Sequence, residues 1–434
     1  MSGQDKVAET ARPGWRGLFG KRADTLPATP RPDIPPELIH AGPVHDYAAE
    51  AFTLSTFFDF ARDEIAASVA ACAAAPAGAL ARIAWFVPHF ETAAYGGVHT
   101  ILRVADHMRR SRGVAPVFVV IGAPDAETPR ARIAAAFPEM AADCEVVALA
   151  RMNEYAEIGP VDAAVATMWM TALAVLRLEG ARRKFYFLQD WEPLLYPAGT
   201  TSALVESSYR FGFHAICNTE TLALSYRECG GVASWFQPAV DGAVFHAERP
   251  KRSQNAPLSL FCYARPGQPR NCFEALAGGL HEVKRQLRSG VDIVTAGADW
   301  DPALHNLAGV VRNLGMLSIA ETGELYRRCD VGLVAMATRH PSYLPLELMA
   351  CGVTVVTNRN PATAWLLRER ENCLLCEMSR SDIADTILDL VDDVALRQSL
   401  AAGGVATIAA AHGSWTAACD QIADQMAAVC ETPA

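Results

Sequence analysis

A predicted loop-to-helix junction near residue 340 carries residue types suited to holding a phosphate and a sugar. Residues 339–357 read RHPSYLPLELMACGVTVVT, and the apolar run VGLVAMA precedes them. We expect a strand, a loop, a helix that begins near residues 343–346 and ends at Gly352, and a second buried strand. The free N–H groups and the dipole at a helix N-terminus favour a phosphate. Glu347 lies about one helical turn further on, where its carboxylate could accept from ribose hydroxyls.

A second segment carries two arginines that could neutralise a diphosphate. Residues 261–271 read FCYARPGQPRN, so Arg265 and Arg270 bracket a predicted strand-to-helix loop. Guanidinium groups bind phosphate oxygens in a forked geometry, and the two prolines stiffen the loop. The structural alternative is a pair of loop arginines that contact surface carboxylates.

Further polar residues follow other predicted strands. Asp190 could act as a base or accept from ligand hydroxyls, and His89 could contact a bound ligand; a capping aspartate and a buried structural histidine are the alternatives. Gly96 and Gly97 lie at a strand-to-helix junction, where a backbone without side chains allows a ligand to approach. A Gly-Gly pair is also ordinary turn chemistry.

Two short motifs could bind metal, but we interpret one as a loop and the other as part of a buried strand. Asp299 and Asp301 form a D-x-D, which holds a divalent cation in some enzymes that use nucleotide sugars. The motif is short and lies inside a βα series, so we interpret it as a loop and expect no metal. Cys373 and Cys376 form a lone CxxC within an apolar run, which indicates small hydrophobic residues of a buried strand.

Composition limits the class of protein. The chain has 434 residues, of which 51% are hydrophobic and 20% charged, which suits two or three globular domains. A net charge of −10 argues against nucleic-acid binding by bulk charge. The N-terminus has no apolar signal segment, no stretch reads cleanly as a transmembrane helix, and the cysteines are scattered, so we expect a cytoplasmic protein. Basic clusters at 109–112 and 182–184 could hold it at the inner face of a membrane, or could be solvated helix ends.

The elements that must position these residues are strands that alternate with helices. The strand candidates are 83–88, 117–122, 144–150, 161–167, 184–190, 214–219, 232–238, 258–265, 292–297, 309–315, 331–337, 354–358 and 372–377. Helical windows include 99–110, 318–329, 380–394 and about 415–430. This alternation predicts parallel βαβ units in two doubly wound α/β domains. Ligands of such sheets bind beyond the carboxyl ends of the strands, so the cleft between the two domains is the expected site.

The chain divides at composition changes. The predicted parts are a flexible tail at 1–45 with seven prolines, a helical N-terminal extension at 46–80, Rossmann-like domains at 81–240 and 241–410, and a terminal helix at 411–434 that packs on the N-terminal domain. The polar stretch 241–257 marks the boundary between the two domains.

These motifs together resemble the family-four glycosyltransferases of the GT-B fold. Residues 341–356 are similar to that family's donor-site signature P-x-x-x-x-E-A-M-A-C-G-x-P-V-V. Four other segments follow the family's order. Residues 95–98 (YGGV) resemble its glycine loop, and residues 237–245 (QPAVDGAVF) resemble its interdomain segment. Residues 313–318 (NLGMLS) resemble its base-contact strand end, and residues 325–331 (LYRRCDV) resemble the helix that follows.

Finer detail resembles the subgroup of the bacterial rhamnosyltransferase WsaF. The cues are residues 187–193 (FLQDWEP), 263–271 (YARPGQPRN) and 340–343 (HPSY). The resemblance implies an N-terminal acceptor domain and a C-terminal nucleotide-sugar domain. The implied reaction transfers L-rhamnose from dTDP-L-rhamnose to a glycan, lipid-linked or protein glycan acceptor, without metal or other cofactor.

The same resemblance implies the roles of individual residues. The implied catalytic residues are Asp190 and His89, and the implied acceptor contacts are Gln189, Trp191 and Glu192. The implied donor contacts are Gly96, Gly97, Arg265, Arg270, Asn271, Leu314, Pro341, Ser342, Tyr343 and Glu347.

One position departs from the family pattern. Many family-four enzymes carry a second glutamate eight residues before the ribose-binding one, and Arg339 stands there in this chain. Arg339 could pair with a phosphate or be a solvated loop residue. Two rival functions therefore stay open: a sugar-nucleotide epimerase of the GT-B type, and a non-catalytic protein that binds nucleotide sugars.

Overall fold

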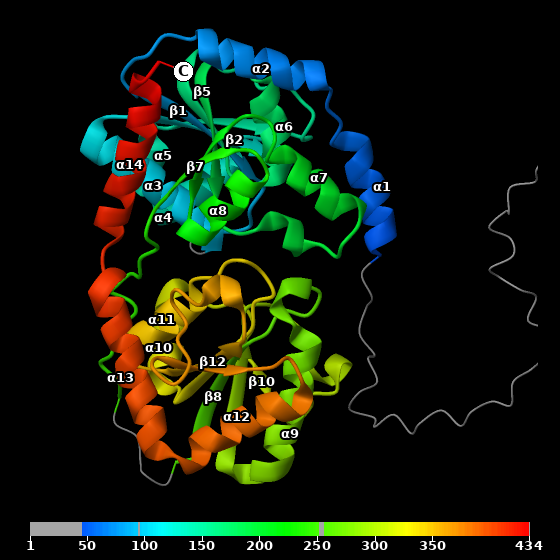
Figure 1. The fold of residues 1–434 in the computed structure, drawn as a ribbon, viewed down its shortest axis with the longest axis vertical. Coiled ribbons are helices and arrows are strands. Elements are labelled where there is room, and N and C mark those ends of the chain that lie inside the picture. The colour runs from blue at the N-terminus through cyan, green and yellow to red at the C-terminus, as the bar shows by residue number, and fades with distance from the viewer. Residues whose placement is uncertain (1–45, 94–95, 251–255, 434) are drawn as a thin grey trace, which may run out of the picture.

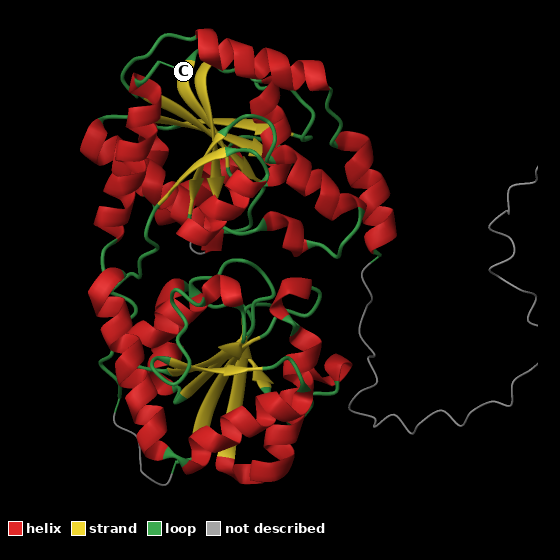
Figure 2. Ribbon diagram, in the orientation of Figure 1, coloured by secondary structure: helices red, strands yellow, loops and turns green. Residues whose placement is uncertain are grey.

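The protein is a two-domain α/β structure with one parallel sheet in each domain. The computed structural model describes residues 46–93, 96–250 and 256–433, so the predicted tail at 1–45 and Tyr95 lie outside the described residues. The two sheets are stacked along the long axis of the molecule, and helices cover both faces of each (Figures 1 and 2). The predicted fold class of two facing doubly wound domains is confirmed.

The N-terminal sheet has seven parallel strands in the order β3-β2-β1-β4-β5-β6-β7. Its inner strand β1 is buried on both faces, which explains the continuous apolar run of residues 83–87. The strands are β1 Arg82–Pro88, β2 Ala115–Ile121, β3 Glu145–Leu149, β4 Val161–Ala166, β5 Ala181–Leu188, β6 His214–Cys217 and β7 Val232–Trp235. The helices are α3 Gly96–Arg112, α4 Glu127–Ala136, α5 Pro138–Asp143, α6 Trp169–Arg177, α7 Thr200–Ser208 and α8 Glu220–Glu228.

The C-terminal sheet has six parallel strands in the order β10-β9-β8-β11-β12-β13. The strands are β8 Leu258–Tyr263, β9 Val291–Ala296, β10 Arg312–Asn313, β11 Val331–Val334, β12 Thr354–Asn358 and β13 Cys373–Cys376. The helices are α9 Phe273–Leu287, α10 Ile319–Arg328, α11 Leu344–Ala350, α12 Arg380–Asp392 and α13 Val394–Ala411. The predicted strand at 309–315 is only two residues long, because Gly309 and Gly315 both adopt positive φ and end the extended backbone.

Both sheets reverse their strand order beside their first strand. The reversal lies between β1 and β4 in one sheet and between β8 and β11 in the other. Loops leave the carboxyl ends of neighbouring strands in opposite directions at such a point, which opens a crevice. Most of the predicted site residues therefore gather where the two crevices face each other.

The chain returns to the N-terminal domain through its last helix. Helix α14, Trp415–Glu431, is capped by Ser414, whose hydroxyl accepts from the amide of Ala417 at 3.1 Å. It runs along the N-terminal domain beside α3 (Figure 1), and Ile422 and Met426 are buried in that domain's core.

Helix α13 is the single described helix that is long and apolar enough to cross a membrane. Its apolar character comes largely from alanine. A stripe of Leu400, Gly404 and Ile408 is buried, and the helix packs against α11, β12 and β13. Its position is therefore that of a covering helix of the C-terminal domain.

The N-terminal extension consists of two helices, α1 Tyr47–Phe57 and α2 Arg62–Ala74, drawn in blue in Figure 1. Phe58, between them, is 1% exposed and packs edge-on against Trp169 at a ring distance of 4.8 Å. Burial of this aromatic side chain fixes the turn between the two helices and attaches the extension to the domain core.

Arg183 joins the ends of two helices that are far apart in the sequence. Its side chain is buried, and its guanidinium donates to four carbonyl groups at the C-terminal ends of α2 and α14. These are the carbonyls of Cys72 at 3.0 Å, Ala75 at 3.3 Å, Val429 at 3.3 Å and Thr432 at 2.9 Å. A cation at two helix C-termini satisfies free carbonyls and opposes both dipoles.

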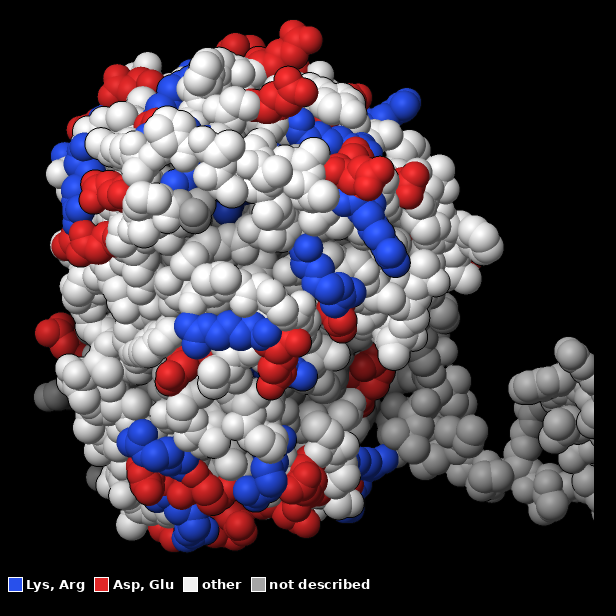
Figure 3. Space-filling view, turned by 45° about the horizontal axis from the view of Figure 1, so that its top comes forward, with Lys and Arg blue, Asp and Glu red and all other residues white. Residues whose placement is uncertain are grey.

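The two basic clusters do not form a free cationic surface. Next to Arg183, Lys184 is buried and donates to the Ser68 hydroxyl at 2.8 Å, and Arg182 pairs with Asp162 at 2.7 Å. The cluster at 109–112 pairs with Asp106, Asp143, Asp420 and Asp424. Positive and negative side chains are likewise interspersed on the face that Figure 3 shows. These clusters therefore do not support the membrane contact considered from the sequence.

We expect Arg183→Ala to lower the free energy of unfolding of the N-terminal domain by about 2–4 kcal/mol, because it leaves four carbonyls without their donor. Urea denaturation followed by tryptophan fluorescence measures this change. The control is Arg210→Ala, which removes an exposed pair with Glu206 at 3.0 Å and should cost about 0.5 kcal/mol or less. Equal losses in the two variants would contradict the assigned role of Arg183.

Candidate functional site

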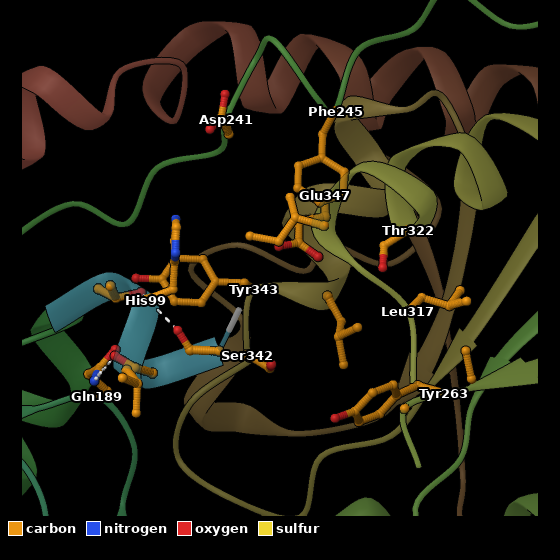
Figure 4. Close-up of a pocket in the computed structure, with 18 of the residues that line it drawn as sticks. His99, Gln189, Asp241, Phe245, Tyr263, Leu317, Thr322, Ser342, Tyr343 and Glu347 are labelled. Atoms are coloured by element: carbon orange, nitrogen blue, oxygen red, sulfur yellow. Dashed lines mark hydrogen bonds between the residues drawn. The ribbon is translucent and has the colours of Figure 1, made fainter. Parts of the chain in front are cut away.

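A cavity of about 600 Å³ lies between the two domains, at the carboxyl edges of both sheets. Its walls are the start of α3, the loops after β5, β8 and β9, the segment between the domains, α10 and the loop that leads into α11. Figure 4 shows side chains from both domains converging on this space. The predicted site residues that line it are Gly96, Gly97, Gln189, Asp190, Arg265, Arg270, Ser342, Tyr343 and Glu347.

Glu347 faces the cavity from the first turn of α11 (Figure 4). No described residue donates a hydrogen bond to its carboxylate or forms an ion pair with it. Burial among the apolar side chains of this domain raises its pKa to about 7. An unpaired carboxyl group in such surroundings costs stability, which is typical of a group kept to meet a ligand.

The loop before α11 uses part of its own hydrogen-bonding capacity. The amide of Ser342 donates to Nδ1 of His340 at 2.9 Å, and Pro345 has no amide hydrogen. Burial lowers the pKa of His340 to about 4, so this imidazole is neutral and can accept that bond. This helix start therefore offers fewer free N–H groups than the sequence predicted. Ser342 has φ 65°, a left-handed conformation that is strained for a residue with a side chain and is often found at functional sites.

The two arginines of the β8–α9 loop differ in their partners. Arg265 lines the cavity, and its guanidinium forms no hydrogen bond or ion pair with any described residue. Arg270 is paired across the cleft: its Nη1 lies 3.0 Å from Oδ2 of Asp190. Of these two arginines, Arg265 is thus an uncompensated cation and Arg270 is shared with a carboxylate of the other domain.

Asp190 is held by both domains. Besides Arg270, it accepts from the Thr338 hydroxyl at 2.5 Å and from the amide of Trp191 at 2.8 Å. The capping bond considered as the structural alternative is therefore present, together with two contacts from the C-terminal domain. Two donors contact Oδ1 and only Arg270 contacts Oδ2, so Oδ2 keeps the capacity to accept from one ligand hydroxyl group.

The start of α3 forms the opposite wall. Gly96 has φ 69°, which favours glycine at this helix start. A Cβ at Gly97 would lie 3.1 Å from Nε2 of Gln189, which donates to the carbonyl of Gly97 at 3.0 Å. Gln189 therefore buttresses this backbone, and the glycine pair allows the close contact.

Trp191 and Glu192, expected to bind an acceptor, point away from the cavity. The carboxylate of Glu192 accepts from the amide of Trp169 and the hydroxyl of Tyr186, both at 2.7 Å, and burial raises its pKa to about 8. Trp191 is 6% exposed and packs against Tyr209. Both side chains help to build the N-terminal core, because the chain turns inward directly after Asp190.

Four further predicted residues do not line the cavity. His89 lies 3.1 Å from Arg132, and buried Asn271 donates to the sulfur of Met336 at 3.1 Å. Pro341 is buried within the loop before α11. Leu314 packs into the C-terminal core, while its neighbours Met316 and Leu317 reach the cavity.

The sequence interpretation missed a polar cluster on the side of the cavity where the domains are linked. Arg103 donates to Asp241 at 3.0 Å, lies 3.2 Å from Nε2 of His99, and stacks over the Trp415 ring at 4.8 Å. Burial lowers the pKa of His99. The i, i+4 spacing of His99 and Arg103 after the glycine pair was a detectable signal, whereas Trp415 lies more than 300 positions away.

On the C-terminal side, the missed residues include Tyr263 and Thr322, which Figure 4 places around the same space. A Cβ at Gly297 would lie 2.5 Å from the Tyr263 ring, so this glycine permits the ring's position. The result is a flat aromatic surface beside Leu317.

The D-x-D motif forms a loop. Asp301 accepts from the amide of Ala303 at 2.9 Å and caps a short 3₁₀ turn, while Trp300 packs against Phe273. Among the described residues, no group of three or more His, Cys, Asp or Glu side chains could hold a metal. Metal independence itself stays a prediction.

The raised pKa of Glu347 makes stability depend on pH. The folded protein holds this proton up to about pH 7, whereas the unfolded chain releases it near the usual value of 4.5. The folded state binds more protons in that interval, so stability falls as pH rises through it. Glu347→Gln should therefore raise the free energy of unfolding by about 1–3 kcal/mol at pH 8 and by little at pH 5. Urea denaturation at both pH values tests this, with the exposed Glu127→Gln as control; a pH-independent difference would contradict it.

The chain matches two models of one protein family. The WsaF N-terminal domain matches residues 82–221, and the WsaF C-terminal domain matches residues 258–388. O-antigen biosynthesis protein RfbC from Myxococcus xanthus is 45% identical over 344 residues, which are 78% of this chain. The chain spans about a quarter of that relative, 26% of its length.

Solved glycosyltransferase structures share the fold at low sequence identity. Sucrose-phosphate synthase from Thermosynechococcus elongatus has a TM-score of 0.61 at 13% identity, over 80% of this chain and 98% of that one. HepE from Anabaena, in complex with UDP and glucose, has a TM-score of 0.57 at 16% identity over the same shares. The two matched domain models cover more than half of the sequence and every strand of both sheets except β7. The chain therefore belongs to the WsaF family and has the GT-B fold.

Proposed function

We propose that this protein is a glycosyltransferase that transfers L-rhamnose from dTDP-L-rhamnose to a glycan during assembly of a bacterial surface polysaccharide or glycoprotein. The observation that carries the proposal is that a basic and an acidic side chain, each without a charged partner, line the same cavity. Arg265 and Glu347 face the same space, and each lacks a charged partner among the described residues. A nucleoside diphosphate sugar carries the complementary groups, namely an anionic diphosphate and a ribose with two hydroxyls.

The charges suggest how a donor would lie in the cavity. The diphosphate would lie between Arg265 and Arg270, with the left-handed Ser342 beside it. The ribose would reach Glu347, and the flat surface of Tyr263 beside Leu317 suits a nucleobase. Ionised Glu347 would accept two hydroxyl bonds, which repays part of its desolvation cost.

Catalysis in this arrangement relies on stabilising the negative charge that develops on the leaving diphosphate. The diphosphate gains negative charge as the anomeric bond breaks, and preorganised guanidinium groups stabilise that charge most in the transition state. The two arginines would supply this stabilisation without a metal. Asp190 lies on the opposite side, where an acceptor hydroxyl would approach, so it is the candidate to receive the acceptor proton once Arg270 contacts the donor.

The names of two similar proteins agree with this proposal. The relative from Myxococcus xanthus is called an O-antigen biosynthesis protein, and the HepE structure contains UDP and glucose. The acceptor would be a lipid-linked or protein-linked glycan. Its contacts would come from Gly96, Gly97, Gln189 and Asp190, because these residues form the N-terminal wall.

A donor panel tests the proposed activity. Thermal shift with UDP-, GDP-, ADP- and dTDP-sugars should single out dTDP-L-rhamnose, and mass spectrometry should detect rhamnosyl transfer to a surface-glycan acceptor at equal rate with and without EDTA. Turnover of a UDP-sugar without an acceptor would instead indicate an epimerase. Nucleotide-sugar binding without any turnover would indicate a binding protein.

We expect Arg265→Ala to lower kcat by about 10²-fold or more, because it removes the uncompensated cation at the leaving group. Binding of dTMP should change little, since dTMP lacks the second phosphate, and Arg265→Lys should restore activity only in part. Steady-state kinetics and calorimetry measure both effects. Arg368→Ala is a matched control, because Arg368 pairs with Glu371 outside the cavity lining. Near-normal turnover in Arg265→Ala would place the diphosphate elsewhere.

A further inference from the structure

Arg339 belongs to the C-terminal domain but makes its contacts on the N-terminal domain. It lies in the loop between β11 and α11. Its Nη1 donates to the Ser225 hydroxyl at 2.7 Å and lies 3.0 Å from Oε2 of Glu228, both on α8. Its guanidinium carbon is 4.9 Å from the centre of the Trp191 ring. Neither alternative considered from the sequence, a phosphate contact or a solvated loop residue, describes this arrangement.

The three contacts differ in what they contribute. The ion pair with Glu228 is exposed, with side-chain exposures of 42% and 71%, so its charge attraction alone is weak. Trp191 is 6% exposed and held by the N-terminal core, so it is a fixed platform for the guanidinium face. A planar guanidinium can stack on this ring and donate in its own plane at the same time, whereas an ammonium group cannot do both.

The loop that Arg339 anchors carries the residues that enter the cavity. Thr338 donates to Asp190 on the N-terminal domain at 2.5 Å, and the Tyr343 hydroxyl accepts from Asn218, also on that domain, at 2.9 Å. Ser342 lies between these two attachments and lines the cavity, whereas Arg339 does not. The loop is thus attached to the N-terminal domain at both ends.

We infer that Arg339 is a positioning residue that holds the two domains together and thereby sets the width of the cleft. It acts through the loop that carries Ser342 and Tyr343, without contact to a ligand in the cavity. The arginine at this departure from the family pattern thus takes part in domain closure. The inference goes beyond the proposed function and depends on it only where activity is measured.

A charge exchange across the contact tests this inference. Spin labels on exposed positions Glu127 of α4 and Asp385 of α12 report the distance between the domains without any substrate. Arg339→Glu should lengthen and broaden the distance distribution, because it places two carboxylates together at α8. Combining it with Glu228→Arg should restore most of the wild-type distribution. Arg339→Lys keeps the charge but not the stacking geometry. Its distance distribution should therefore lie between those of the wild type and Arg339→Glu.

The control is Arg210→Glu, which disrupts an exposed pair within the N-terminal domain and should leave the distribution unchanged.

In a transfer assay, Arg339→Glu should lower kcat at least about tenfold while changing the affinity for dTMP less than about twofold. Misplacement of the cavity walls slows the reaction without removing a ligand contact. An unchanged distribution in Arg339→Glu, or no recovery in the double variant, would overturn the inference. Failure to find any transfer would count against the proposed function alone, since the distance measurement is independent of it.

Discussion

The ion pair between Asp190 and Arg270 joins the two domains at the centre of the cleft. Asp190 follows β5 of one sheet, Arg270 follows β8 of the other, and their charged atoms lie 3.0 Å apart. Both side chains are mostly buried, with exposures of 15% and 22%, so water screens their attraction less than at the surface. An anion that enters beside Arg265 competes with Asp190 for the same guanidinium. Binding of an anion in the C-terminal half of the cavity is therefore coupled to the ion pairing of Asp190 in the N-terminal half.

The path of the chain limits how this cleft can change. The chain passes from the first domain to the second after β7 and returns between α13 and α14. Trp415, at the start of α14, lies under Arg103 in the cavity wall, and Arg183 holds the far end of the same helix. Because α14 is fixed along its length to the N-terminal domain, relative motion of the domains must occur in the two connecting segments. Noncovalent contacts such as that of Arg339 with α8 then limit this motion.

The candidate site was predictable where function depends on local sequence. Arg265, Arg270 and Glu347 lie in loop-to-helix segments whose residue types identify them, and all three line the cavity. Trp191 and Glu192 also follow a strand end, but they turn into the core. A strand end locates a residue at the edge of the sheet, whereas the direction of its side chain depends on which neighbours can bury it. The partner of Arg339 was unpredictable for the same reason, since Glu228 lies 111 positions away in the other domain.

The sequence by itself determined the α/β class, the thirteen strands found among the described residues and the division into two sheets. These features follow from apolar runs and helical periodicity, which are local properties of the chain. The tertiary structure alone determined which charges stay unpaired. The arginines and lysine of residues 182–184 look like a surface patch in the sequence, yet their charges are used inside the fold. Arg265 looks no different in the sequence but lacks a partner among the described residues. Pairing depends on distances between segments that are remote along the chain, and only the packed domains bring these segments together.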